Sequence, residues 1–245
     1  MEQNINSKKE PLGNGYYLNV SKNHTFGTDA VLLSHFAASK KVKRHCDLGA
    51  GCGIVSMLLI RDGIVAQSDG VEISEEAVSL ARRTAAEYAE DSFTPVLSDL
   101  RELKGVLPLS EYDLVTCNPP YKAEGAGIVS ESSTDKVARH ETACSLRDVI
   151  KTASRLLKSG GRFCICQRPE RLSDIVNLMR EYKLEPKTLR LVSKRVGEEP
   201  WLILVEGRRD GKSGMRIMPT LYVYEGEDYS DEMMKIYGPY KEGHV

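Results

Sequence analysis

Residues 47–53 read D-L-G-A-G-C-G, an acid followed by glycines at positions 49, 51 and 53. A strand is predicted just before this turn, at 45–48, and a helix just after it, at 54–61. Glycine allows the backbone to turn tightly and allows a ligand to approach the main chain closely. The order of strand, glycine turn and helix is typical of an α/β fold that binds its ligand at the carboxyl ends of its strands.

Strands and helices alternate outward from this turn, as expected of a parallel sheet with crossover helices. The strands of the sheet are predicted at 45–48, 65–73, 94–97, 112–117, 162–166, 188–193 and 201–206, and another strand precedes them at 16–20. The helices are predicted at 29–38, 54–61, 75–88, 146–157 and 171–182. The last two strands follow each other closely, which favours an antiparallel pair at the sheet edge. The sequence therefore predicts a Rossmann-like α/β fold: a seven-stranded, mostly parallel sheet with helices on both faces and an antiparallel edge strand.

Length and composition indicate one globular domain. The 245 residues carry a formal net charge of −1. We expect an N-terminal strand and helix segment at 1–40, a core at 41–210 and a tail at 211–245, to which no structure is assigned. No apolar run reaches the roughly 18 residues of a membrane span, and the N-terminus has no apolar signal region. A cytoplasmic location is therefore expected.

The six cysteines form no C-x-x-C pair and no cluster with histidine at metal-binding spacing. We therefore expect no metal site. Charge is uneven, since residues 180–216 hold ten Lys and Arg against six Asp and Glu. A second basic cluster consists of Lys40, Lys41, Lys43 and Arg44. Such runs are usually solvated surface, and the alternative is contact with a polyanion.

Two acids beyond the glycine turn favour a nucleoside cofactor. Glu72 lies near the end of the strand predicted at 65–73, where a carboxylate can bind both hydroxyls of a ribose. Asp99, after the next strand, could accept a hydrogen bond from an adenine amine. The spacing G-x-G-x-G differs from the G-x-G-x-x-G of dinucleotide folds and favours S-adenosyl-L-methionine over NAD. The alternative is a turn that only packs its helix against its strand.

A second motif appears where residues 115–121 read V-T-C-N-P-P-Y. It follows the strand predicted at 112–117 and therefore lies at the same edge of the sheet as the glycine turn. Each proline fixes its own φ and biases the preceding residue toward extended geometry, which makes the turn stiff. The turn presents an amide, backbone carbonyls and a flat ring, which suit a planar substrate with an NH2 group. The expected catalytic residues are Asn118, Pro119, Pro120 and Tyr121. The alternative is a simple Asn-Pro turn with a half-buried tyrosine.

Further motifs occur in a fixed order around these two. They are F-G-T-D-A-V-L-L (Phe26–Leu33), D-L-G-A-G-C-G, V-E-I-S (Val71–Ser74), N-P-P-Y, A-R-H-E (Ala138–Glu141) and Y-S-D-E-M-M-K-I-Y (Tyr229–Tyr237). In these motifs the chain resembles the class I S-adenosylmethionine-dependent methyltransferases, and among them the bacterial tRNA1(Val) adenine-N6 methyltransferases. The resemblance covers nearly the whole chain. It implies a single methyltransferase domain that methylates N6 of an adenosine in a tRNA anticodon loop, at position 37 of tRNA1(Val).

The resemblance also implies roles for individual residues. Asn118 and the Pro119 carbonyl would hold the target amine, and Tyr121 would stack on the base. The cofactor-binding residues expected from the motifs and the resemblance are Thr28, Asp29, Asp47, Gly49, Gly51, Gly53, Glu72, Ile73, Asp99, Leu100 and Asn118. We expect the RNA to be contacted by Arg139 and, within the basic region at 180–216, by Lys194 and Arg195. The oligomeric state cannot be predicted from these patterns.

Three other functions share some of these features. Glutamine-N5 methyltransferases that act on release factors also use N-P-P-Y, but they carry a helical domain before the glycine turn, and only 46 residues precede Asp47. Guanine-N2 methyltransferases of ribosomal RNA use a similar tetrad and commonly add an N-terminal domain. An RNA-binding module that keeps the cofactor site without activity is the non-enzymatic alternative. The intact tetrad and cofactor positions argue against this third alternative.

Overall fold

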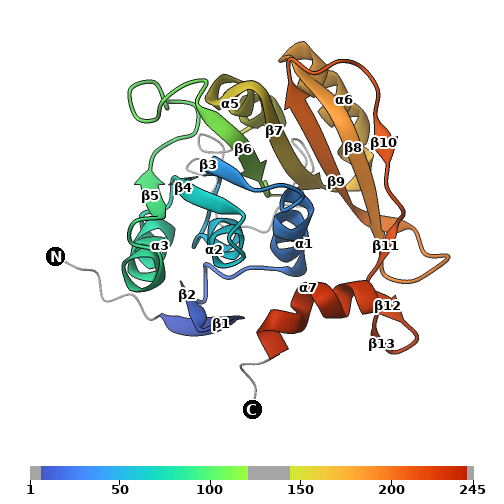
Figure 1. Cartoon of the computed structure of the whole chain (residues 1–245), viewed down its shortest axis with the longest axis horizontal. Helices are drawn as coiled ribbons and strands as arrows, with labels where there is room; N and C mark the ends of the chain where they lie inside the picture. The colour runs from blue at the N-terminus through green and yellow to red at the C-terminus, as the bar shows by residue number, and fades with distance from the viewer. Residues whose placement is uncertain (1–6, 121–143, 242–245) are drawn as a thin grey trace, which may run out of the picture.

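The computed structural model describes residues 7–120 and 144–241, with side chains up to residue 238, and its centre is a nine-stranded sheet. The sheet follows the order β10-β8-β9-β7-β6-β3-β4-β5, with β11 beside β8 (Figure 1). Its seven long strands are β3 (Val42–Leu48), β4 (Val65–Glu72), β5 (Phe93–Leu97), β6 (Tyr112–Cys117), β7 (Leu157–Gln167), β8 (Leu184–Ser193) and β9 (Pro200–Arg209). The mostly parallel sheet and its seven long strands, predicted from the sequence, are confirmed, and two further two-residue strands extend the sheet.

The reversed strand lies one position in from the predicted edge. β9 runs antiparallel to both of its neighbours, β7 and β8. β8 points the same way as β7, and its outer side carries the two-residue strands β10 (Arg216–Ile217) and β11 (Leu221–Tyr222), both parallel to it. The hairpin between β8 and β9 thus reverses one strand only, and the carboxyl end of β8 joins those of the parallel strands.

Helices cover both faces of the sheet. One face carries α1 (Thr28–Ala37), α2 (Ile54–Arg61) and α3 (Glu75–Tyr88), and the other carries α5 (Leu146–Leu156) and α6 (Leu172–Glu181), which follows the short 3-10 helix η1 (Pro169–Arg171). Neighbouring residues of β7 alternate between the two cores: Cys164 and Cys166 face α1, whereas Phe163 and Ile165 face α5. A strand buried on both faces reads as a continuous apolar run, which explains why R-F-C-I-C lacks a polar alternation.

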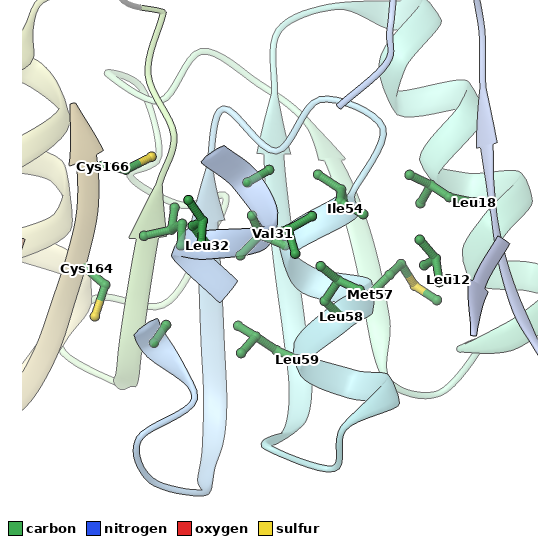
Figure 2. Packing of buried hydrophobic residues seen from close by; sticks show 14 of the residues in the cluster. Leu12, Leu18, Val31, Leu32, Ile54, Met57, Leu58, Leu59, Cys164 and Cys166 are labelled. Carbon is green, nitrogen blue, oxygen red and sulfur yellow. The ribbon is translucent and has the colours of Figure 1, made fainter. Parts of the chain in front are cut away.

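The first core is closed by segments from both ends of the chain. Figure 2 shows α1 and α2 packed between β7, marked by Cys164 and Cys166, and the N-terminal hairpin, marked by Leu12 and Leu18. That hairpin pairs β1 (Lys8–Gly13) with β2 (Tyr16–Val20), of which only β2 was predicted. β1 was missed because K-K-E-P-L-G has no alternating apolar pattern and contains a proline.

The C-terminal tail is also ordered, which the sequence did not predict. It forms the hairpin β12 (Tyr224–Glu225) and β13 (Asp228–Tyr229), followed by α7 (Asp231–Lys241). Met233 and Ile236 of α7 are buried against the core that contains α1. In Figure 1, α7 lies next to α1. The tail therefore reaches the same region as the carboxyl ends of the strands.

Strand register sets the position of the candidate site. Leu48 at the end of β3 pairs with Cys117 of β6 and Val71 of β4, and Cys117 pairs in turn with Ile165 of β7. Glu72 pairs with Leu97 at the end of β5. The turns after these strands therefore lie side by side along one edge of the sheet, called the carboxyl edge below.

Candidate functional site

A cavity of about 250 Å³ opens at the carboxyl edge between the start of α1, the glycine turn and Asn118. Its lining comes from three segments: Thr25, Phe26, Gly27, Asp29 and Ala30; Asp47, Gly49, Ala50, Gly51, Cys52, Ile54 and Val55; and Asn118. Five of the residues predicted from the sequence are among them: Asp29, Asp47, Gly49, Gly51 and Asn118. The structure thus brings together three motifs that lie far apart in the sequence.

The glycines of the turn have two different environments. Gly49 and Gly51 have φ of +72° and +55°, and a Cβ on either would meet no atom within 4 Å. Gly53 has φ of +92°, and a Cβ there would lie 2.6 Å from the Phe93 ring. Gly49 and Gly51 therefore leave open space over the turn, whereas Gly53 allows α2 to start against β5 and does not line the cavity.

Asp47 is fully buried at the end of a polar chain that crosses the sheet. The Thr116 hydroxyl donates to its Oδ1 at 2.6 Å. The imidazole of His45 lies between two hydroxyls, with Nε2 2.8 Å from Thr116 Oγ1 and Nδ1 2.8 Å from Ser68 Oγ. Ser68 is also hydrogen-bonded to Ser56 at 2.9 Å. Because Thr116 gives its one proton to Asp47, His45 Nε2 is the nitrogen that carries a proton.

Burial sets the protonation of both titratable groups in this chain. Desolvation, with a smaller contribution from the positive charge of Arg162, lowers the pKa of His45 to about 3, so the imidazole is neutral. Desolvation raises the pKa of Asp47 to about 7, with a smaller contribution from Glu72, while the Thr116 hydrogen bond opposes the rise. A cationic partner close to Asp47 would lower this raised pKa and favour the charged form of the carboxyl group.

Glu72 supports the glycine turn from the neighbouring strand. Its Oε2 accepts from the Gly51 backbone N–H at 2.9 Å, and its Oε1 accepts from Ile73 at 2.8 Å and Ser74 at 2.9 Å. A carboxylate offers about four lone-pair positions, so three of them are used by backbone donors. Ile73 itself is 50% exposed, an apolar side chain left open beside the turn.

Asp99 lies at the end of β5 and is oriented by its own turn. Arg101 donates to it from its backbone N–H at 2.8 Å and from its guanidinium group at 2.5–3.0 Å. These hydrogen bonds lower the pKa of Asp99 below its usual value. Leu100 lies between the two and is partly buried. Neither Asp99 nor Leu100 lines the cavity, and both lie on the same carboxyl edge beyond Glu72.

Asn118 lies at the opening of the cavity and is held on two sides. Its Nδ2 donates to Asp29 Oδ2 at 3.1 Å, and the Cys166 thiol donates to its Oδ1 at 3.0 Å. Pro119 is partly buried and Pro120 is exposed, as expected of a turn that leaves the sheet. Tyr121, the last residue of the tetrad, lies outside the described residues.

The start of α1 connects the cavity to the tail. Thr28 accepts a hydrogen bond from the Tyr237 hydroxyl of α7 at 3.0 Å. The Tyr237 ring stacks on Tyr229 at 5.5 Å, and Tyr229 stacks on Tyr224 at 5.2 Å. Thr28 therefore faces the tail, whereas its neighbour Asp29 faces the cavity. The sequence placed both residues in one cofactor-binding set and did not distinguish these two directions.

The residues predicted to contact RNA lie in different parts of the chain. Lys194 is exposed after β8, at the carboxyl edge, and Arg195 lies 5.2 Å above the Tyr224 ring. Arg139 lies outside the described residues. The basic cluster at 40–44 precedes or begins β3 and is therefore at the opposite edge, where Arg44 pairs with Glu111 at 2.6 Å. Of the two basic regions, only the one around Lys194 shares an edge with the cavity.

In the part of the chain that the structure describes, no three His, Cys, Asp or Glu side chains come together as a metal-binding group. Within those same ranges, no helix has both the length and the apolar character needed to cross a membrane.

Several side chains of this region were not predicted from the sequence. Thr116, His45 and Cys166 contact Asp47 or Asn118 directly or through one hydroxyl, yet each lies inside a strand and reads as a core residue. Tyr237 is 209 positions from Thr28. The F-G-T-D motif, which supplies Phe26 and Gly27 to the cavity, is a local sequence signal that could have identified those two residues.

Comparison with known proteins identifies the family of this chain. The sequence model of the methyltransferase small domain family matches residues 21–182. A Porphyromonas gingivalis protein named tRNA1(Val) (adenine(37)-N6)-methyltransferase is 31% identical over 196 residues, which cover 74% of this chain and 73% of that protein. An Aeromonas hydrophila protein of the same name is 25% identical over 215 residues, covering 87% and 89% of the two chains.

Solved structures show the same fold. A predicted O-methyltransferase from Agrobacterium tumefaciens matches with a TM-score of 0.70 at 22% identity, covering 87% of this chain and 97% of that one. Geranyl diphosphate C-methyltransferase from Streptomyces coelicolor matches with a TM-score of 0.55 at 14% identity, covering 73% and 79%. The chain therefore belongs to the methyltransferase small domain family, and it is similar to relatives named tRNA1(Val) (adenine(37)-N6)-methyltransferase.

Proposed function

We propose that this protein transfers a methyl group from S-adenosyl-L-methionine to N6 of an adenosine in a tRNA anticodon loop, at position 37 of tRNA1(Val). The observation that carries the proposal is the position of Asn118: its amide stands at the opening of a cavity lined by Asp47 and the glycine turn. The names of the relatives support the choice of adenine and of tRNA. Such a substrate implies a cytoplasmic protein, and we propose that residues 1–245 act as one domain.

The residues around the cavity fit the cofactor. Gly49 and Gly51 leave space that any Cβ would fill, which suits close approach of a ligand to the main chain. We propose that Asp47 faces the positively charged end of the molecule, and that Glu72, with Ile73 beside it, faces the ribose. Asp99 and Leu100 would border the adenine. When bound, the cofactor supplies a methyl group on a positively charged sulfur.

The remaining chemistry is done by the tetrad. An adenine amine is a weak nucleophile because its lone pair is delocalised into the ring. We propose that Asn118 Oδ1 and the Pro119 carbonyl each accept one N–H bond of this amine, which pushes it toward tetrahedral geometry and frees the lone pair. The two oxygens also stabilise the positive charge that develops on nitrogen, and the surplus proton then leaves to water. Alignment and oriented dipoles thus replace a general base.

The base must reach this edge from a nucleic acid. Stacking on an aromatic ring contributes about 1–3 kcal/mol per base, and we propose that Tyr121 provides the ring. A nucleotide is splayed out at least cost from a single-stranded loop. An anticodon loop meets that requirement, whereas a paired stem does not.

The proposal is tested with labelled S-adenosyl-L-methionine and two acceptors, total tRNA and release factors. We expect label in tRNA only, as N6-methyladenosine. In the Asn118→Ala variant we expect methyl transfer to be lost while cofactor affinity stays within about threefold of the wild type, because the amide contacts the amine. Label in protein, or in N2-methylguanosine, would refute the proposal in favour of the other two enzyme classes.

A further inference from the structure

The side-chain amide of Asn118 is fixed by partners on both sides. Asp29, from the start of α1, accepts from Nδ2 at 3.1 Å, and Cys166, from β7, donates to Oδ1 at 3.0 Å. The two partners come from different elements and lie 137 positions apart in the sequence. Cys166 is fully buried, so its thiol cannot turn away to water. A contact of this kind from one side could be incidental, but the two together determine which way the amide points.

The chemistry of the two partners favours one orientation of the amide. A carboxylate oxygen accepts hydrogen bonds and cannot donate, so the NH2 end of Asn118 must face Asp29. The carbonyl end then faces Cys166, where a thiol donor matches it. In the reverse orientation, the Asn118 oxygen would face the carboxylate and its NH2 would face a thiol, which is only a weak acceptor. Both contacts therefore favour the same state.

Asp29 is itself held in place. Its Oδ1 accepts from the backbone N–H of Ala30 at 2.9 Å at the first turn of α1. A Cβ on Gly27 would lie 2.6 Å from the same oxygen, so the glycine of F-G-T-D leaves the room that the carboxylate occupies. Both oxygens of Asp29 thus have a fixed partner, Ala30 for one and Asn118 for the other.

We propose that Asp29 and Cys166 are positioning residues that keep the Asn118 carbonyl oxygen turned toward the substrate amine. This inference rests on the proposed function, because it assigns a task to an amide that would hold the amine. An amide oxygen has two lone pairs, so Oδ1 can accept from the thiol and from a substrate N–H together. If the amide flipped, its NH2 would meet the NH2 of adenine, and both groups would be donors.

The test compares Cys166→Ala with Cys166→Ser and Cys164→Ala. Alanine removes the donor, serine keeps one, and Cys164 is the matched control because it lies two residues away on β7, is equally buried and has its sulfur 4.0 Å from Glu206. We expect kcat to fall about tenfold or more in Cys166→Ala, since small errors of alignment are costly. It should recover in Cys166→Ser and stay near the wild-type value in Cys164→Ala. The dissociation constant for S-adenosyl-L-methionine should change less than about threefold in all three.

A second measurement follows the amide itself. In 15N-labelled protein, the Asn118 NH2 resonances are assigned by their absence in Asn118→Ala. We expect them to shift in Cys166→Ala and in Asp29→Asn, and to stay in place in Cys164→Ala. Asp29→Asn keeps the size but replaces one acceptor by a donor, which must then face either Ala30 N–H or Asn118 NH2. It also serves if Cys166→Ala fails to fold.

The outcomes separate this inference from the proposed function. Wild-type kcat in Cys166→Ala, equal losses in Cys166→Ser and Cys166→Ala, or unmoved Asn118 resonances would each overturn the positioning role. Absence of methyl transfer to tRNA by the wild-type protein would refute the proposed function instead. The resonances need no substrate, so they would still report on the orientation of the amide.

Discussion

At the scale of single residues, the environment of Asp47 links the chemistry of the site to the stability of the fold. Full burial raises the pKa of its carboxyl from the ordinary 3.8 to about 7. The folded protein therefore holds this proton more firmly than the unfolded chain does. Ionisation of Asp47 near neutral pH therefore lowers the free energy of unfolding. A cation bound next to the carboxylate would raise it again.

Replacing Asp47 by Asn should therefore stabilise the protein without cofactor at neutral and alkaline pH. Between about pH 4 and 7 the folded state binds more protons than the unfolded state, so the wild type loses stability as pH rises through this window. Asn cannot ionise and escapes that loss. We expect the free energy of unfolding of Asp47→Asn to exceed that of the wild type by about 2–4 kcal/mol at pH 8 and to converge with it near pH 4.

Denaturant unfolding at several pH values measures this difference. Asp210→Asn is the control, since it makes the same exchange at an exposed position. A difference between Asp47→Asn and the wild type that does not change with pH would contradict the account of Asp47. In the same variant we expect affinity for S-adenosyl-L-methionine to fall, because the carboxylate proposed to face its positive charge is gone.

At the scale of elements, the start of α2 depends on Gly53. Its φ of +92° favours glycine, and a Cβ would lie 2.6 Å from Phe93, which packs under the turn. Gly63, after α2, also has positive φ, at +63°, but a Cβ there would meet no atom within 4 Å. The two glycines therefore share a backbone preference and differ in steric surroundings.

Gly53→Ala should destabilise the fold more than Gly63→Ala. Both variants carry the left-handed backbone penalty of about 1–2 kcal/mol, and only Gly53→Ala adds overpacking of about 1–3 kcal/mol. Thermal or denaturant unfolding of the two variants provides the comparison. Equal losses would mean that Phe93 gives way freely and does not set the position of the turn.

The tail helix α7 makes a second prediction at this scale. Met233 is fully buried, whereas the adjacent Met234 is 38% exposed. We expect Met233→Ala to cost about 2–4 kcal/mol of stability and Met234→Ala less than about 1 kcal/mol. Because α7 also holds Thr28 through Tyr237, Met233→Ala should weaken cofactor binding as well. Similar small effects for both methionines would show that the tail is not docked in solution.

Local signals explain which elements could be predicted. α3 was predicted with its observed bounds because Ser74 caps it, accepting from Ala77 N–H, and acids occupy its first turn. β6 was also predicted with its observed bounds. β7 was predicted too short, because its first residues include G-G, and α7 was missed because Gly238 and Pro239 interrupt its pattern. Its stability comes from packing against α1, which no local pattern records.

The same reasoning applies to the site. Asp47, Gly49, Gly51 and Asn118 stand directly after or at the ends of strands, so the rule that ligands bind at carboxyl edges could place them. Cys166 could not be placed, because its distance from Asn118 depends on the register of β7 against β6. That register is a property of the assembled sheet.

At the scale of the whole molecule, charge is distributed between the two edges of the sheet. Lys194 is exposed at the carboxyl edge, and Lys41 is exposed at the opposite edge, just before β3. If the substrate RNA docks beside the cavity, only the first of these lysines can reach its phosphates. We expect Lys194→Glu to weaken tRNA binding several-fold and to reduce its salt dependence, and Lys41→Glu to leave both near the wild type. Filter binding over a range of salt concentrations measures both quantities, and equal effects of the two changes would rule out docking at the carboxyl edge.

The most direct test of the central claim maps modified nucleosides by mass spectrometry in tRNA from a strain that lacks this protein. The account predicts that N6-methyladenosine disappears from position 37 of tRNA1(Val). It should return when the wild-type protein is supplied and stay absent with the Asn118→Ala variant. An unchanged level of N6-methyladenosine at that position in the deletion strain, or its restoration by Asn118→Ala, would contradict the account.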